Sequence, residues 1–267
     1  MPETPPVVLS VDEVTLEFAG LRALSGVSFA VEQGSLTALV GPNGAGKTSL
    51  LNCMGGFYTP TRGRVTFEGA AISELPPHRV AAAGVARIFQ FVELFRHMTV
   101  LDNILLGRHR HMRAGVLAGS LFWGVSRREE TRERRRAEEV IEFLELERSR
   151  KEPVASLPFG VQKLVGVGRA LAMEPRLLLL DEPSTGMNRE EKENLARFLL
   201  RIKHELGTTM LWIEHDMELV GDLAERVVVL DFGQKIAEGP PDTVLRDPRV
   251  AEAYLGRAWD AQKGAPS

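Results

Sequence analysis

The sequence predicts an α/β protein with a mainly parallel core sheet, an antiparallel β subdomain and an inserted α-helical subdomain. Strand-like and helix-like segments alternate from Arg176 onward, which is typical of a parallel sheet. The run from Leu177 to Leu180 is continuously apolar, as in a strand that is buried on both faces. The first 70 residues instead read mainly as strands around one helix, and residues 91–172 read mainly as helices.

Apolar spacing and turn residues set the expected order of elements. Residues 7–18 alternate apolar and polar side chains and predict a strand. Thr99 is suited to cap a helix over 99–106, and apolar residues on one face predict a helix over 126–147. The other expected strands are 27–31, 36–40, 63–68, 85–89, 177–180, 208–213, 226–230 and one ending at 238–239, and the other helices are 48–54, 78–83, 189–206 and 217–223.

These elements are expected to form one domain over residues 7–256. Its core would comprise residues 7–90 and 173–256, its helical subdomain about residues 91–172, and its flexible termini residues 1–6 and 257–267.

Composition narrows the class of protein. Of the 267 residues, 44% are hydrophobic and 26% are charged, which is ordinary for a soluble globular protein. No uninterrupted apolar stretch approaches the ~20 residues that cross a bilayer, and the N-terminus lacks the pattern of a secretory signal. The single Cys53 excludes an internal disulfide and fits a reducing compartment. The sequence therefore favours a cytoplasmic protein that is able to have a membrane partner.

Charge gives no indication of a nucleic-acid partner. The formal net charge is −3, so there is no global attraction to nucleic acid or to anionic lipid. Residues 127–136 mix both signs of charge, which favours a solvated helix face over a nucleic-acid patch.

A glycine-rich segment follows the expected strand 36–40. It has the Walker A spacing, and the strand before it and the helix after it are the context that this motif requires. Glycines let successive backbone N–H groups turn toward a polyphosphate, and the helix that follows adds its positive dipole end. The predicted nucleotide-binding residues are Gly41, Asn43, Gly44, Ala45, Gly46, Lys47, Thr48 and Ser49. A turn that only links strand to helix is the alternative, but Lys47 and Thr48 favour a P-loop NTPase core that binds a nucleoside triphosphate.

Two carboxylates, Asp181 and Glu182, end the most apolar strand. Ligands of α/β sheets bind at the carboxyl ends of the strands. Beside a Walker A segment, Asp181 is the expected partner of Mg²⁺, where Thr48 also supplies a hydroxyl, and Glu182 is placed to act as general base toward water. A helix-capping acid pair is the structural alternative.

Together these features resemble the ATPases of ATP-binding-cassette (ABC) transporters, over about residues 8–255. Gln90 matches the Q-loop glutamine, which the resemblance assigns to metal and water, and His215 matches the switch histidine that contacts the γ-phosphate. Residues 185–188 fall on the D-loop. Spacing alone leaves Phe18 open between a purine-stacking ring and a core residue, and the family's adenine-stacking aromatic matches its position. The resemblance implies ATP and Mg²⁺ as cofactors.

Residues 157–163 occupy the place of the family signature, so Phe159 and Gly160 are expected to contact nucleotide held by a partner subunit. The segment departs from the pattern, because Pro158 stands where a serine is usual and Val161 where a glutamine or similar residue is usual. Proline has neither a hydroxyl nor an N–H, so the signature is expected to be weakened.

Finer features resemble importers of branched-chain amino acids and related small polar solutes. They include residues 86–90, 94–103 and 247–256 and the insertion at 107–124. The resemblance implies transmembrane permease subunits, a second ATPase subunit (the same or different), a periplasmic solute-binding protein and a place on the inner face of the plasma membrane. Phe91, Leu94 and Phe95 are either a groove for a permease helix or subdomain core.

Other functions are less favoured. An exporter ATPase, for example one handling lipids, has a similar cassette. A soluble cassette acting on nucleic acid or ribosomes usually carries two cassettes or long coiled coils, which this chain does not show. A non-enzymatic scaffold would be expected to lack Glu182 or His215.

Overall fold

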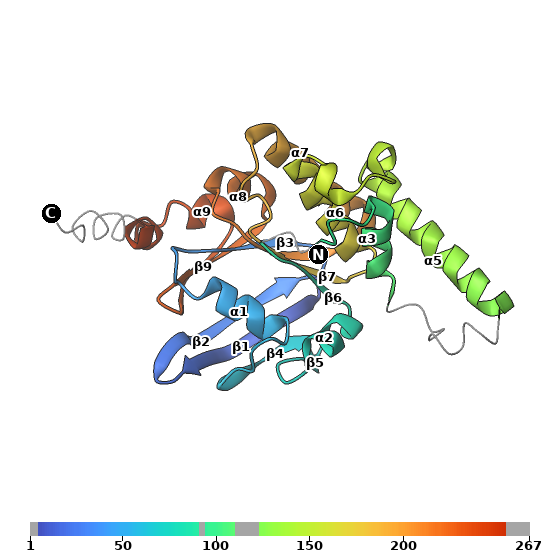
Figure 1. Cartoon of the computed structure of the whole chain (residues 1–267). Coiled ribbons are helices and arrows are strands. Elements are labelled where there is room, and N and C mark those ends of the chain that lie inside the picture. Colours follow the sequence, from blue (N-terminus) through green and yellow to red (C-terminus); the bar gives the residue numbers. More distant parts are fainter. Residues whose placement is uncertain (1–4, 91–93, 110–122, 255–267) are drawn as a thin grey trace.

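A six-stranded sheet forms the centre of the protein (Figure 1), in the order β10-β9-β3-β8-β7-β6. The computed structural model describes residues 5–90, 94–109 and 123–254. All strands of this sheet run parallel except β10, which is antiparallel to β9. The strands are β3 (Leu36–Val40), β6 (Val85–Ile88), β7 (Leu177–Asp181), β8 (Thr209–Ile213), β9 (Arg226–Asp231) and β10 (Gln234–Gly239). The predicted mainly parallel core is confirmed.

A second sheet of four antiparallel strands has the order β2-β1-β4-β5. It consists of β1 (Val7–Phe18), β2 (Leu21–Glu32), β4 (Arg62–Phe67) and β5 (Ala70–Ala71). β2 begins earlier than the predicted strand 27–31 because it pairs with β1 as far as Phe18 and Leu21. Ala19 and Gly20 between them have positive φ, as a two-residue hairpin turn requires.

Alternate side chains of the central sheet enter two apolar layers. In β7, Leu177 and Leu179 pack with α1 (Lys47–Met54) and the antiparallel sheet. Leu178 and Leu180 point the other way, into a cluster with α6 (Phe159–Leu171) and α7 (Arg189–Leu206). This two-residue alternation explains why the strand is apolar throughout. The remaining helices beside the core are α2 (Pro77–Ala83), α8 (Met217–Leu223) and α9 (Pro241–Val244).

Helices dominate the middle of the chain. α3 (Val100–Gly107) is capped by Thr99 as predicted, and Asp102 completes a capping box. α5 (Trp123–Phe143) starts and ends earlier than the predicted 126–147. It ends earlier because Glu145 turns the chain with φ of 58°, while Leu144 stays buried beyond the helix. Two single-turn 3₁₀ helices, Glu147–Ser149 and Val154–Ser156, lead to α6. The helical subdomain at about 91–172 stays a prediction as a unit, and most of the insertion lies outside the described residues.

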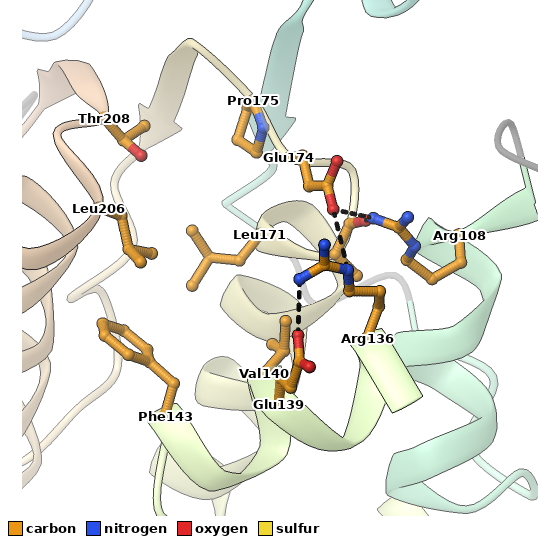
Figure 2. Close-up of a pocket in the computed structure, with 11 residues that line it drawn as sticks. Arg108, Arg136, Glu139, Val140, Phe143, Leu171, Glu174, Pro175, Leu206 and Thr208 are labelled. Carbon is orange, nitrogen blue, oxygen red and sulfur yellow. Dashed lines mark hydrogen bonds and ion pairs between the residues drawn. The ribbon is translucent and has the colours of Figure 1, made fainter. Parts of the chain in front are cut away.

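A cavity of about 400 Å³ lies where these helices meet the core (Figure 2). Its apolar wall includes Val140 and Phe143 of α5 and Leu206 at the end of α7. At its rim the carboxylate of Glu174 forms an ion pair with the guanidinium of Arg108, with 2.9 Å between nitrogen and oxygen. The charged groups therefore join α3 to the turn that follows α6.

No helix among the described residues is long and apolar enough to cross a membrane.

Candidate functional site

The Walker A segment links β3 to α1 in a conformation that needs its glycines. Gly41, Gly44 and Gly46 have φ of 149°, 77° and 101°. A Cβ on Gly41 would lie 2.1 Å from the carbonyl oxygen of Leu230 in β9, and one on Gly46 would lie 2.8 Å from the carbonyl oxygen of Ala23 in β2. The loop is therefore packed directly on neighbouring backbone, and only glycine fits at these two positions.

Lys47 lies at the start of α1 with only 5% of its surface exposed. Its ammonium donates hydrogen bonds to the carbonyl oxygens of Gly41 and Pro42, at 2.6 and 3.0 Å. A cavity of about 480 Å³ opens beside it. The lining includes all the predicted residues from 43 to 49, together with Glu182 and Phe232. A buried cation and the positive end of a helix at one cavity wall favour an anionic ligand.

Asp181 is the last residue of β7 and is buried. Its carboxylate pairs with the guanidinium of Arg87 in β6 at 2.7 Å, and both side chains are less than 10% exposed. Arg87 also donates to the side-chain oxygen of Asn52 in α1 at 2.5 Å. Arg87 thus ties the carboxylate to the helix of the Walker A segment, a role that the sequence did not reveal.

The three predicted catalytic residues meet at the edge formed by the ends of β6, β7 and β8. Gln90 donates its amide Nε2 to Glu182 Oε2 at 2.6 Å. His215 Nε2 lies 2.5 Å from the other oxygen, Oε1. Thr185 makes a longer contact of 3.4 Å with Oε2. Because β8, β7 and β6 are neighbours in the sheet, residues far apart in sequence converge on one carboxylate.

Glu214, which the sequence analysis passed over, holds the segment that carries the histidine. It is 2% exposed, accepts the backbone N–H of His215 at 2.8 Å and accepts the hydroxyl of Ser184 at 2.6 Å. Because Ser184 follows β7 and Glu214 follows β8, this carboxylate fixes the two loops against each other. The acid directly before the predicted histidine was the signal available in the sequence.

The signature segment begins α6, with Pro158 as its N-cap. Phe159 is exposed, and the N–H of Gly160 donates to Glu191 Oε1 of α7 at 2.9 Å. Glu191 also completes the cap of α7 through Asn188. The signature is thus attached to the helix that follows the D-loop, and Glu191 was not predicted.

Phe18 lies exposed at the end of β1, with its ring edge-on to Tyr58 at 5.2 Å between centroids. The side of the Walker A cavity nearest this hairpin is lined by Leu21, Arg22 and Ala23. Phe232, which is 74% exposed, lines the same cavity from the β9–β10 turn. The adenine-stacking role of Phe18 stays a prediction.

A parallel sheet with a Walker A loop at the carboxyl end of β3 and paired acids at the end of β7 defines a P-loop NTPase. Comparison with known families narrows this class. Residues 24–185 match the family described as ABC transporter, and residues 234–260 match the family described as branched-chain amino acid ATP-binding cassette transporter. The chain belongs to the ABC transporter family, as the sequence predicted, and is an ATPase subunit of that family.

Known proteins resemble the chain over nearly its whole length. The high-affinity branched-chain amino acid transport ATP-binding protein BraF of Pseudomonas aeruginosa is 38% identical, covering 94% of this chain and 98% of BraF. The ADP conformation of MJ1267, an ATP-binding cassette of an ABC transporter, has a TM-score of 0.83 at 33% identity, covering 94% of this chain and 99% of the other. The dimeric post-hydrolysis state of the cassette MJ0796, bound to ADP and Pi, has a TM-score of 0.72 at 25% identity, covering 87% and 98%.

Proposed function

We propose that this chain is the ATP-hydrolysing subunit of an importer for branched-chain amino acids. The Walker A loop and the carboxylates cannot select a solute, because they serve hydrolysis in any cassette. The match at residues 234–260 carries the proposal, since it lies beyond those motifs and belongs to a branched-chain amino acid family. BraF, whose name states the same transport, supports it over almost the full length of both chains.

The Walker A cavity fits a nucleotide with its phosphates on the loop. Gly46 at the N-cap of α1 has no side chain to occupy the end of the helix, so the first amides of α1 are open to an anion. Lys47 would exchange the carbonyls of Gly41 and Pro42 for the terminal phosphates. Residues 43–49 line the cavity and would cradle the phosphate chain. Phe18 is proposed to stack on the adenine.

The donor set also fits Mg²⁺. This ion prefers oxygen ligands and is commonly held by one or two carboxylates together with phosphate oxygens and water. Thr48 offers a hydroxyl, Asp181 a carboxylate and Gln90 an amide oxygen, all of them oxygen donors. Bound there, the ion would neutralise charge on the transferred phosphoryl group.

Glu182 would act as the general base for hydrolysis. Its carboxylate is held at one oxygen by Gln90 and at the other by His215, so its orientation is fixed before any water approaches. A fixed carboxylate can accept a proton from the attacking water, while His215 and Lys47 donate toward the charge that develops on the γ-phosphate.

Catalysis is proposed to require two cassettes. The signature residues Phe159 and Gly160 lie at the start of α6 and would contact nucleotide on a partner's loop. The dimeric state of MJ0796 supports such a pairing, with either a second copy or a different ATPase subunit. Permease subunits at the inner face of the plasma membrane and a periplasmic solute-binding protein complete the proposed importer.

Uptake of a labelled solute tests the function directly. The chain would be purified with its membrane subunits, reconstituted into liposomes with the binding protein, and supplied with ATP on the side of the ATPase. Leucine, isoleucine and valine should accumulate, and labelled lysine should not. ATP-driven uptake of a different solute class, or export of lipid, would contradict the proposal.

A further inference from the structure

A buried lysine stands beside the catalytic residues without having been given a role. Lys163 lies in the second turn of α6, at the end of the signature segment, and is only 3% exposed. Burial lowers the pKa of its ammonium, and the neighbouring carboxylates of Glu182 and Glu214 oppose that change. Burying a charged amine costs free energy unless it is hydrogen-bonded, so the groups that the ammonium of Lys163 contacts indicate its role.

The ammonium of Lys163 reaches the Q-loop rather than a carboxylate. Its Nζ donates to the backbone carbonyl oxygen of Gln90 at 2.6 Å. It also lies 5.4 Å from the centre of the Phe159 ring, within reach of a cation–π contact. One side chain therefore touches an exposed signature residue and the residue that orients the catalytic carboxylate.

Gln90 is held at both of its ends. Its main-chain oxygen accepts from Lys163, and its side-chain amide donates to Glu182 at 2.6 Å. A displacement of α6 would move the carbonyl of Gln90, and with it the amide that fixes Glu182. α6 is also attached to α7 by the hydrogen bond from the N–H of Gly160 to Glu191. A shift of the signature would therefore strain this hydrogen bond together with those of Gln90.

We propose that Lys163 is a positioning residue that links the signature of this chain to its own Glu182. Contact between Phe159 or Gly160 and nucleotide on a partner's loop changes the placement of α6, and Lys163 transmits that change through Gln90. The two nucleotide sites of a cassette pair are coupled in this way. The inference rests on the proposed function, because it needs a partner that carries nucleotide.

Replacement of Lys163 in the assembled transporter tests the link. Lys163→Met keeps an unbranched stem in the core and removes the donor, and Lys163→Arg keeps a charged donor. ATP turnover would be measured against ATP concentration to give kcat, KM and the Hill coefficient. Lys151→Met, which changes an exposed lysine of the same region, is the matched control.

Lys163→Met should lower kcat about tenfold, the effect of one lost hydrogen bond to a charged group, and should bring a wild-type Hill coefficient above one down to one. KM should stay within about twofold, because Lys163 is not among the residues lining the Walker A cavity. Lys163→Arg should restore most of kcat and of the Hill coefficient, and Lys151→Met should match wild type. A merely structural role would lower the yield of active protein without changing the Hill coefficient.

Three outcomes would overturn the link. One is a wild-type Hill coefficient of one, and another is a Lys163→Met variant that keeps the wild-type kcat and Hill coefficient. The third is a loss in Lys163→Met that Lys163→Arg does not restore. If Lys163→Met unfolds at a lower urea concentration than wild type, Lys163→Gln gives the same readouts with a neutral amide in place of the ammonium. If wild type itself shows no ATP turnover, the proposed function fails, whereas normal wild-type turnover with an unaltered variant refutes only the link.

Discussion

The Walker A side and the signature side of the chain are built from different kinds of groups. At the strand ends, polar and charged side chains converge on one another: Gln90 and His215 hold Glu182, and Arg87 holds Asp181. At the start of α6 the exposed groups are Pro158 and the ring of Phe159, whereas Gly160 is buried and its N–H donates to Glu191. The charged residues of that region, Glu191 and Lys163, point back into the same chain.

This contrast indicates how the work of a cassette pair is divided. In the proposed pair, the strand ends would hold the carboxylates and the histidine that hydrolysis needs, whereas the signature would offer an exposed ring and the N-terminal end of α6 to a partner. Substitutions at the strand ends should therefore act on hydrolysis or on folding, and substitutions in the signature should have smaller effects that depend on the partner.

The largest effect is expected for Glu182→Gln. The amide cannot accept the proton of the attacking water, so ATP turnover of the assembled transporter should fall by about 10²–10⁴-fold. ATP binding should be preserved, because the size of the side chain changes little and residues 43–49 of the Walker A loop stay unchanged. Equilibrium binding of labelled ATP and steady-state turnover would be measured together. Glu190→Gln, at an exposed acid in the first turn of α7, is the control. Wild-type turnover in Glu182→Gln would show that Glu182 is not the general base.

Arg87→Met, also at the strand ends, should lower the free energy of unfolding. The change strands the buried carboxylate of Asp181, and breaking a buried ion pair costs about 3 kcal/mol or more. Urea denaturation would report the free energy of unfolding. Arg22→Met breaks an exposed pair with Glu17 and should change that free energy little. Equal effects of the two variants would mean that the buried pair does not support the strand ends.

Two glycines of α6, Gly160 in the signature and Gly166 beyond it, should respond to alanine with opposite signs. A Cβ on Gly160 would lie 2.6 Å from Glu191, so Gly160→Ala should expel that side chain from two backbone N–H groups and destabilise the fold by about 1 kcal/mol. A Cβ on Gly166 meets nothing within 4 Å among the described residues, so Gly166→Ala should stabilise by about 0.5–1 kcal/mol. Thermal unfolding of both variants checks the opposite signs. A stabilising Gly160→Ala would show that Glu191 does not hold the signature.

The smallest effect is expected for Pro158→Ser. A serine would return the hydroxyl that the signature lacks, and one hydrogen bond corresponds to about a fivefold gain in turnover at the partner's site. Pro240→Ser is the matched control, because Pro240 is also an N-cap, with φ of −59° and ψ of 146° against −54° and 151° for Pro158. Turnover of the assembled transporter would be compared. Unchanged or lower turnover in Pro158→Ser would show that the signature is not weakened by its proline.

Much of this arrangement was predictable from the sequence because its signals are local. The glycine spacing of residues 41–48 and the apolar run 177–180 each reflect one loop or one strand, and the structure has both as expected. The role of Glu182 was predicted from the rule that ligands bind at the carboxyl ends of the strands, and those of Gln90 and His215 from the family resemblance.

The unpredicted partners depend on contacts between distant segments. Arg87 meets Asp181 across neighbouring strands, and Glu191 meets Gly160 across two helices. Neither pair has a characteristic spacing, because each is fixed by the packing of whole elements. Lys163 read as a helix residue, and only its burial beside Gln90 gives it a partner. The end of α5 was misplaced because buried Leu144 continues the apolar pattern beyond the helix.

The central claim is that the hydrolytic site is shared between two subunits. The most direct measurement compares ATP turnover per chain for the purified chain, at a concentration where sedimentation shows a monomer, with that of the assembled transporter. Turnover should be at least tenfold lower for the monomer, because its Walker A loop lacks a facing signature. Equal turnover per chain in the two preparations would contradict it.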